Sequence, residues 1–208
     1  MARYFIELAY NGTKYSGFQI QENANTIQAE IEKAFSTIHR NSVNLTGSSR
    51  TDAGVHALQN FFHFDYENPL HPQFIYKMNA ILPDDIVVNN VFEMGEQAHS
   101  RFNAVSREYI YRIHRFKNPF LKDVSYFFPY KLDINLMHEA AGFVKLQTNF
   151  YAFSKTNTQV KNFICQIEFC NWRQEGEELQ LTIKANRFLR GMVRLLTASI
   201  LKVGRHKL

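Results

Sequence analysis

Residues 47–57 read Gly-Ser-Ser-Arg-Thr-Asp-Ala-Gly-Val-His-Ala, and the elements predicted on either side of this segment set the fold of the first half of the chain. The pattern before it predicts a short strand over 43–45, and the aromatic run at 61–64 predicts a strand after it. A glycine near each end favours a tight, exposed loop, because glycine adopts backbone conformations that other residues avoid. The segment is therefore predicted to present Asp52 on a loop between two strands.

The rest of the first half mixes strands and helices. Residues 3–10 alternate apolar and polar side chains, which predicts a strand with one buried face. Thr26 can cap a helix over 27–38, whose apolar residues recur at helical spacing. A short helix over 74–79 and a strand over 86–92 follow.

The second half shows a similar mixture. The predicted elements are a strand over 106–114, a helix capped by Asp133, a hairpin of 163–172 with 179–186, and a closing helix over 187–203 with Gly204 as its C′ residue. We therefore predict an α+β fold in two halves, 1–105 with the Asp52 loop and 106–208.

Composition favours a globular protein with a polyanionic partner. The 208 residues are 45% hydrophobic and 21% charged, with a formal net charge of +5. Arginine and aromatic residues are interleaved, as in Arg101-Phe102 and at 187–190, a pattern suited to RNA phosphates and unstacked bases. No apolar run reaches the ~18 residues of a membrane span, so we expect a cytoplasmic protein. Neither the two cysteines nor any glycine-rich phosphate loop indicates a metal or a cofactor.

Spacing alone leaves two features open. An Arg-x-Asp pair such as Arg50 and Asp52 is more often a surface ion pair than a catalytic group. Arg187, Arg190 and Arg194 are spaced i, i+3 and i+7, which predicts one stripe on the closing helix. That stripe is equally typical of a solvated basic face.

The order of several blocks resembles the tRNA pseudouridine synthase A family across essentially the whole chain. The matching blocks are 47–57, Tyr10 to Gln21, Thr26-Ile27-Gln28, Leu82 to Ile86, Arg101 to Tyr111 and Ala185 to Arg194. Asn11 and Phe18 stand where the family usually has Asp and Trp. Family members continue beyond Gly204-Arg205, so we expect the C-terminal half to be truncated relative to the family.

This resemblance implies a fold, a reaction and partners. The fold would be two ferredoxin-like or RNA-recognition-like halves, each a mainly antiparallel sheet flanked by helices, with a basic cleft between them. The reaction would convert uridine to pseudouridine in the anticodon stem-loop of tRNA. It is a redox-neutral isomerisation, so no cofactor and no metal are expected. The family also implies a homodimer.

The resemblance assigns roles to individual residues. Asp52 would act as nucleophile or as base at the sugar, and these two routes stay open. Arg194 would pair with Asp52, and Tyr111 would stack on the uracil and handle the proton, although Tyr111 also suits core packing. The expected substrate-binding residues are Arg50, Thr51, Gly54, His56, Tyr109, Phe188, Leu189, Arg187 and Arg190.

Two rival functions remain at this stage. A truncated relative could be a non-catalytic module that binds structured RNA. A glycosidase using Asp52 is a more distant rival, because such enzymes usually place a second carboxylate opposite the first, and the sequence shows no clear partner.

Overall fold

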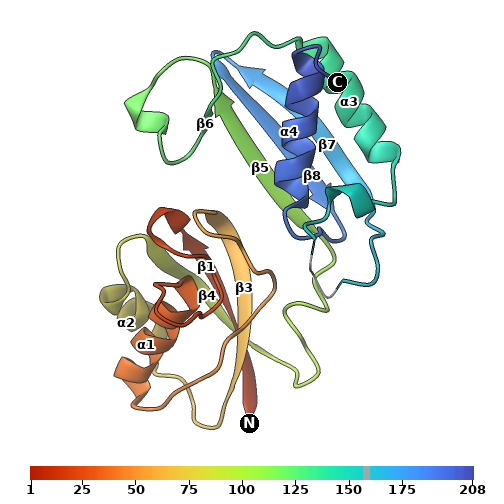
Figure 1. Cartoon of the computed structure of the whole chain (residues 1–208). Coiled ribbons are helices and arrows are strands. Elements are labelled where there is room, and N and C mark those ends of the chain that lie inside the picture. Colours follow the sequence, from red (N-terminus) through yellow and green to blue (C-terminus); the bar gives the residue numbers. More distant parts are fainter. Residues whose placement is uncertain (157–159) are drawn as a thin grey trace. The chain divides into compact units, whose positions relative to one another are not determined.

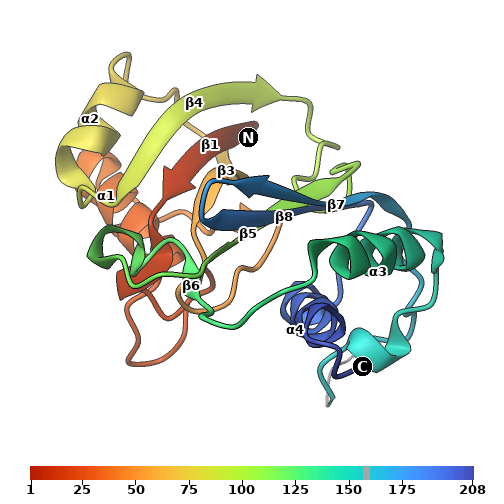
Figure 2. The same ribbon diagram turned by 90° about the horizontal axis from the view of Figure 1, so that it is seen from above.

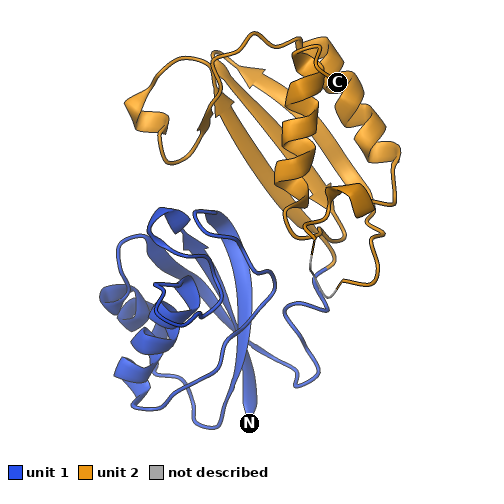
Figure 3. Ribbon diagram, viewed as in Figure 1, with its two compact units in different colours: residues 1–104 blue, residues 105–208 orange. Residues whose placement is uncertain are grey.

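Each half of the chain builds a four-stranded, mostly antiparallel sheet with helices packed on it. A computed structural model describes residues 1–156 and 160–208. They divide into unit 1, Met1–Ala104, and unit 2, Val105–Leu208 (Figures 1 and 3). Each unit has a hydrophobic core of its own. This confirms the predicted α+β class with two halves.

Unit 1 has the strand order of a ferredoxin-like sheet. Its strands are β1 (Ala2–Tyr10), β2 (Thr46–Gly47), β3 (Ala57–Tyr66) and β4 (Ile86–Met94), in the order β2-β3-β1-β4. The predicted alternation of β1 is confirmed, since every second side chain from Tyr4 to Tyr10 is buried. Helices α1 (Ile27–His39) and α2 (Phe74–Ile81) contribute to the core beneath this sheet face.

Local signals fix the ends of these elements. The Thr26 side chain accepts a hydrogen bond from the Ala29 backbone N–H, so Thr26 is the N-cap of α1 as predicted. The strand predicted at 43–45 is wrong, because only Thr46–Gly47 pairs with β3. The backbone just before β2 is hydrogen-bonded to side chains of α1 instead. Glu32 accepts from the Leu45 N–H, and Gln28 donates to the Leu45 carbonyl.

Unit 2 stacks two helices on one face of its sheet (Figure 2). Its strands are β5 (Arg107–His114), β6 (Tyr126–Phe127), β7 (Ile167–Glu175) and β8 (Glu178–Ala185), in the order β6-β5-β8-β7, with β6 parallel to β5. Helices α3 (Ile134–Leu146) and α4 (Met192–Gly204) cover the sheet. Asp133 caps α3 as predicted, since its side chain accepts from the Leu136 N–H.

The closing helix begins five residues later than predicted. Gly191 precedes it with φ 77°, a left-handed conformation that a helix does not continue through. Arg187 and Arg190 therefore lie before α4, and the stripe that they were predicted to share with Arg194 does not exist. Gly204 is the last helical residue and not a C′ cap. Glycine suits this position because a Cβ there would lie only 2.6 Å from Met137 Cγ.

The first strand of the unit 2 hairpin also starts later than predicted, at Ile167. The residues before it pair with a loop instead: the Cys165 N–H donates to the Thr148 carbonyl, and the Phe150 N–H donates to the Phe163 carbonyl. Cys165 and Cys170 are both buried in the unit 2 core.

Candidate functional site

The Asp52 loop connects β2 to β3 in unit 1. Asp52 is half-buried and begins a turn, because its carbonyl accepts a hydrogen bond from the Val55 N–H at 3.2 Å. Gly54 holds φ 75° in this turn, a backbone conformation that favours glycine. Arg50, two residues before Asp52, is exposed. The carboxylate therefore sits at the bend of a short, constrained loop.

Residues Tyr10 to Gln21, the N-terminal block, pack directly on this loop through two glycines. A Cβ at Gly12 would lie 2.1 Å from the Val55 carbonyl oxygen, and a Cβ at Gly17 would lie 2.8 Å from the Thr51 carbonyl oxygen. Backbone hydrogen bonds join the same segments, from the Phe18 N–H to the Thr51 carbonyl and from the Gly54 N–H to the Tyr15 carbonyl. The loop on both sides of Asp52 is thus tied to backbone rather than to mobile side chains.

Buried polar side chains support the loop from beneath. The Tyr10 hydroxyl lies 2.9 Å from Thr51 Oγ1 and accepts a hydrogen bond from Asn60 Nδ2 at 3.2 Å. Asn60 Oδ1 accepts in turn from Ser48 Oγ at 2.7 Å. Burial raises the pKa of Tyr10, so its hydroxyl stays protonated and can serve both partners. Thr51, which precedes Asp52, is therefore positioned from the interior of the unit.

His56 closes the loop by holding the N-terminal block. Its Nδ1 accepts a hydrogen bond from the Gly12 N–H at 2.9 Å. An accepting Nδ1 requires the tautomer with hydrogen on Nε2. Because Nδ1 already accepts a hydrogen bond from the protein backbone, only Nε2 of His56 is left for the predicted contact with substrate.

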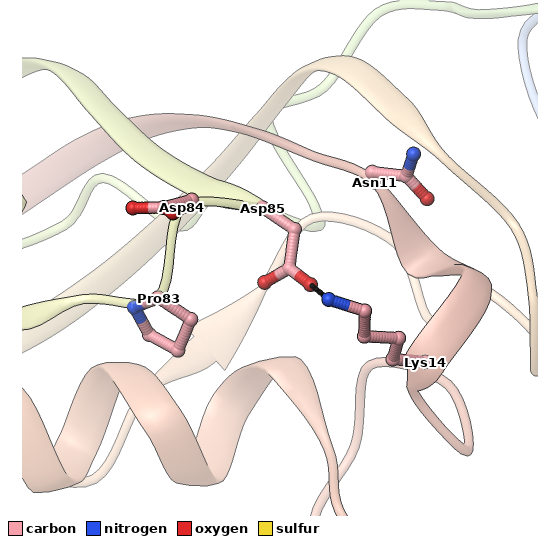
Figure 4. A pocket seen from close by; sticks show the side chains of 5 residues that line it. All are labelled: Asn11, Lys14, Pro83, Asp84 and Asp85. Carbon is pink, nitrogen blue, oxygen red and sulfur yellow. Dashed lines mark ion pairs between the residues drawn. The ribbon is translucent and has the colours of Figure 1, made fainter.

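The segment Leu82 to Ile86 supports the N-terminal block through Asp85 (Figure 4). The Asn11 N–H donates to the Asp85 carbonyl at 2.8 Å, and Lys14 Nζ lies 3.4 Å from Asp85 Oδ2. The Tyr15 hydroxyl donates to the other oxygen of the same carboxylate. Burial, followed by this carboxylate, raises the pKa of Tyr15 and keeps it protonated. Asp85 thus holds the block that holds the Asp52 loop.

Tyr111 and Arg194 lie near each other in unit 2. Tyr111 is half-buried on β5 and packs against the unit 2 core, as the alternative interpretation of this residue expected. Burial raises its pKa, the neighbouring Tyr126 adds to the rise, and the positive charge of Arg194 opposes it. The rings of Tyr111 and Tyr126 meet edge to face at 6.5 Å. Tyr111 is therefore a neutral phenol beside an exposed guanidinium.

The other unit 2 candidates surround the start of α4. The Tyr109 ring meets the Phe188 ring edge to face at 5.1 Å. Leu189 is buried in the core, with 4% of its surface exposed, which favours a packing role for its side chain. Arg187 is half-buried, and Arg190 is exposed. Burial raises the pKa of the Cys165 thiol, and the positive charge of Arg187 opposes this rise.

The candidates thus form one group in each unit. Unit 1 contains Arg50, Thr51, Asp52, Gly54 and His56, and unit 2 contains the remaining predicted residues. Tyr10, Gly12, Gly17 and Asp85 entered the sequence analysis only as members of matching blocks, and their supporting roles were not predicted. For Gly12 and Gly17 the one signal in the sequence was glycine itself, and Tyr10 and Asp85 carried none.

The described residues contain neither a candidate metal site nor a helix that could span a membrane. Within 1–156 and 160–208, no group of three or more His, Cys, Asp or Glu side chains is placed to hold a metal ion. In the same residues, no helix is both long and apolar enough to cross a membrane.

A family model and several known proteins match this chain under the same description. Residues 8–103 and 147–208 match the family model described as tRNA pseudouridine synthase. The chain is 42% identical to tRNA pseudouridine synthase A of Parabacteroides distasonis, in an alignment covering 100% of this chain and 83% of that protein. Identity is 45% to the protein of that name from Bacteroides fragilis, covering 99% and 83%, and 36% to the one from Bacillus pumilus, covering 96% and 83%. At this identity and coverage, the chain belongs to the tRNA pseudouridine synthase family.

Proposed function

We propose that this protein converts uridine to pseudouridine in the anticodon stem-loop of tRNA. The observation that carries the proposal is the Asp52 loop, which is fixed by backbone contacts from the N-terminal block in a chain of this family. The proposed reaction requires one carboxylate held at a defined position beside a sugar. A surface ion pair, the simpler interpretation of Arg50 and Asp52, has no need of such support.

The chemistry rearranges one nucleotide without gain or loss of atoms. The bond from ribose C1′ to uracil N1 breaks, the ring turns, and a bond from C1′ to C5 forms. C5 loses its proton and N1 gains one, so the product is an isomer of the substrate. Asp52 attacks the sugar as a nucleophile or acts on it as a base, and both routes need its ionised form.

The target base must leave its stack before Asp52 can reach the sugar. Arg50 is exposed two residues before Asp52. A guanidinium there can hold a neighbouring phosphate or fill the space that the base leaves. We assign Arg50 this positioning role, with Thr51 and Gly54 keeping the loop in shape.

We assign Tyr111 to stacking on the uracil. Its raised pKa keeps the phenol protonated near neutral pH, so Tyr111 can donate a hydrogen bond but is poorly suited to remove a proton unaided. Arg194 is the proposed partner of the Asp52 carboxylate, because a guanidinium can bind both oxygens and does not lose its proton. Tyr109, Phe188, Arg187 and Arg190 are assigned to tRNA contact.

We further propose that the protein acts in the cytoplasm as a homodimer. The support is the family resemblance and a substrate that is a cellular RNA. Light scattering of the protein with and without tRNA measures its molecular mass and therefore its oligomeric state. A mass equal to one chain under all conditions would contradict the dimer.

The decisive experiment follows the proton that leaves C5. Unmodified tRNA transcribed with 5-tritiated UTP should release tritium to water in the presence of the protein, and Asp52→Asn should abolish the release. Affinity for tRNA should stay within a few-fold, because phosphate contacts dominate it. Asp84→Asn, which changes an exposed carboxylate of the same unit, is the matched control and should remain active.

The same experiment separates the rivals. If the unmutated chain binds tRNA but releases no tritium, it is a non-catalytic RNA-binding module. If Asp52→Asn retains turnover, the catalytic assignment is wrong.

A further inference from the structure

The turn over residues 98–103 presents an arginine and an aromatic ring on the surface of unit 1. Phe102 has 75% of its surface exposed, and Arg101 is also exposed. The guanidinium carbon of Arg101 lies 6.0 Å from the centre of the Phe102 ring. Exposed single apolar residues are common, so exposure alone decides nothing.

What distinguishes this turn is how firmly it is anchored. Ser100 is 4% exposed and its Oγ donates to the Thr46 carbonyl at 2.9 Å, while lying 2.8 Å from Nδ1 of the buried His63. The Asn103 side chain accepts a hydrogen bond from the His99 N–H. The His99 ring packs between His63 at 4.6 Å and Phe102 at 4.2 Å. The exposed Phe102 ring is therefore held in place by contacts that reach the buried residues Ser100 and His63.

The anchor connects the turn to the Asp52 loop. Thr46 belongs to β2, pairs with His63 of β3, and lies two residues before Ser48, where the loop begins. All of these contacts lie within unit 1. The position of the Phe102 ring relative to the strand that carries the Asp52 loop is therefore set by unit 1 alone.

We propose that Arg101 and Phe102 form an RNA-contact site, in which the Phe102 ring stacks on an unpaired base of the tRNA and Arg101 binds an adjacent phosphate. The inference rests on the proposed function and extends it to a substrate contact outside the Asp52 loop. A fixed aromatic ring accepts any base face, and a neighbouring cation suits the phosphate beside it. The net charge of +5 is consistent with a polyanionic ligand.

The test compares variants of Phe102 in the whole protein. Phe102→Ala should raise KM and the Kd for unmodified tRNA about tenfold, the usual scale of one base stack, and leave kcat within about twofold. Phe102→Trp should retain wild-type affinity, whereas Phe102→Leu, apolar but not flat, should behave like alanine. Duplex RNA without unpaired bases should bind equally to all of them. Phe143→Ala on α3, at 66% exposure, is the matched control and should change nothing.

A change at Arg101 should appear in the salt dependence of tRNA binding. Arg101→Gln should reduce the slope of log Kd against log salt by about one phosphate contact. An unchanged slope would remove Arg101 from the site.

The outcomes separate this inference from the proposed function. If the unmutated chain releases no tritium, the proposed function fails, while the Kd series still decides whether Phe102 contacts RNA. If turnover is normal and Phe102→Ala leaves KM and Kd unchanged, the inference is overturned. A lower Tm with unchanged Kd would likewise overturn it, since Phe102 would then only brace the turn.

Discussion

Gly12 gives a direct test of how the Asp52 loop is held, because its missing side chain leaves room for the loop backbone. A Cβ at this position would lie 2.1 Å from the Val55 carbonyl oxygen and 2.8 Å from its carbonyl carbon, whereas ordinary contacts begin near 3.4 Å. Gly12→Ala must therefore push the two segments apart by roughly 1 Å. Both contacting atoms are backbone, so no side-chain rotation can absorb the shift.

We expect turnover to fall about a hundredfold, since a displacement of roughly 1 Å at a reacting group costs about that factor. Stability should fall by about 1–3 kcal/mol, the usual effect of forcing an extra methyl group into a packed region. Tritium release measures turnover, and urea unfolding measures stability. The Kd for tRNA should change by less than about threefold, because phosphate contacts dominate affinity.

Gly142→Ala on α3 is the matched control. A Cβ at Gly142 meets nothing within 4 Å, and alanine in a helix interior stabilises by about 0.5–1 kcal/mol. Turnover should be unchanged. If Gly12→Ala is folded at the assay temperature and keeps full turnover, contact with Gly12 does not position the Asp52 loop.

Two further predictions concern charge. Arg194→Ala should cut turnover about a hundredfold or more, and Arg194→Lys should recover only part of it, because a point charge replaces a planar fork. We expect Arg190→Ala mainly to weaken tRNA binding and to reduce its salt dependence. If Arg194→Ala has only that effect, Arg194 is a phosphate contact and not a partner of Asp52. Burial lowers the pKa of His63 from 6.5 to about 4, so the unfolded chain takes up this proton first and stability falls as pH drops through that window. Urea unfolding at about pH 7 and pH 4.5 should show a loss on the order of 2 kcal/mol that His63→Gln lacks, and equal losses in both proteins would exclude His63 as its source.

Elements with strong local signals were predictable from sequence. The alternation of β1, the cap and apolar stripe of α1, and the Asp133 cap of α3 each depend on residues within a few positions of one another. The start of α4 was not predicted, because apolar spacing continues through Leu189 before the helix begins. Leu189 is buried from a turn, and the left-handed Gly191 ends that turn. Periodicity records burial and does not distinguish a packed turn from a helix.

The candidate residues came from the resemblance, whereas the contacts that support the Asp52 loop were not predicted. The resemblance pointed to Asp52 directly. Gly12 and Val55 are far apart in sequence, and only the fold brings the glycine against the loop carbonyl. A sequence shows that a glycine is present, but it does not name the backbone that approaches it.

The supporting contacts also explain why so many motif residues surround one proposed catalytic carboxylate. Asp85 holds Tyr15, Tyr15 and Gly12 belong to the block that packs on the loop, and the loop positions Asp52. The departure at Asn11 fits this arrangement. Its side chain accepts a hydrogen bond from the Thr13 N–H, which an aspartate would do equally well. The local requirement at this position is therefore an acceptor oxygen and not a charge, which is why the substitution can leave the support of Asp52 intact.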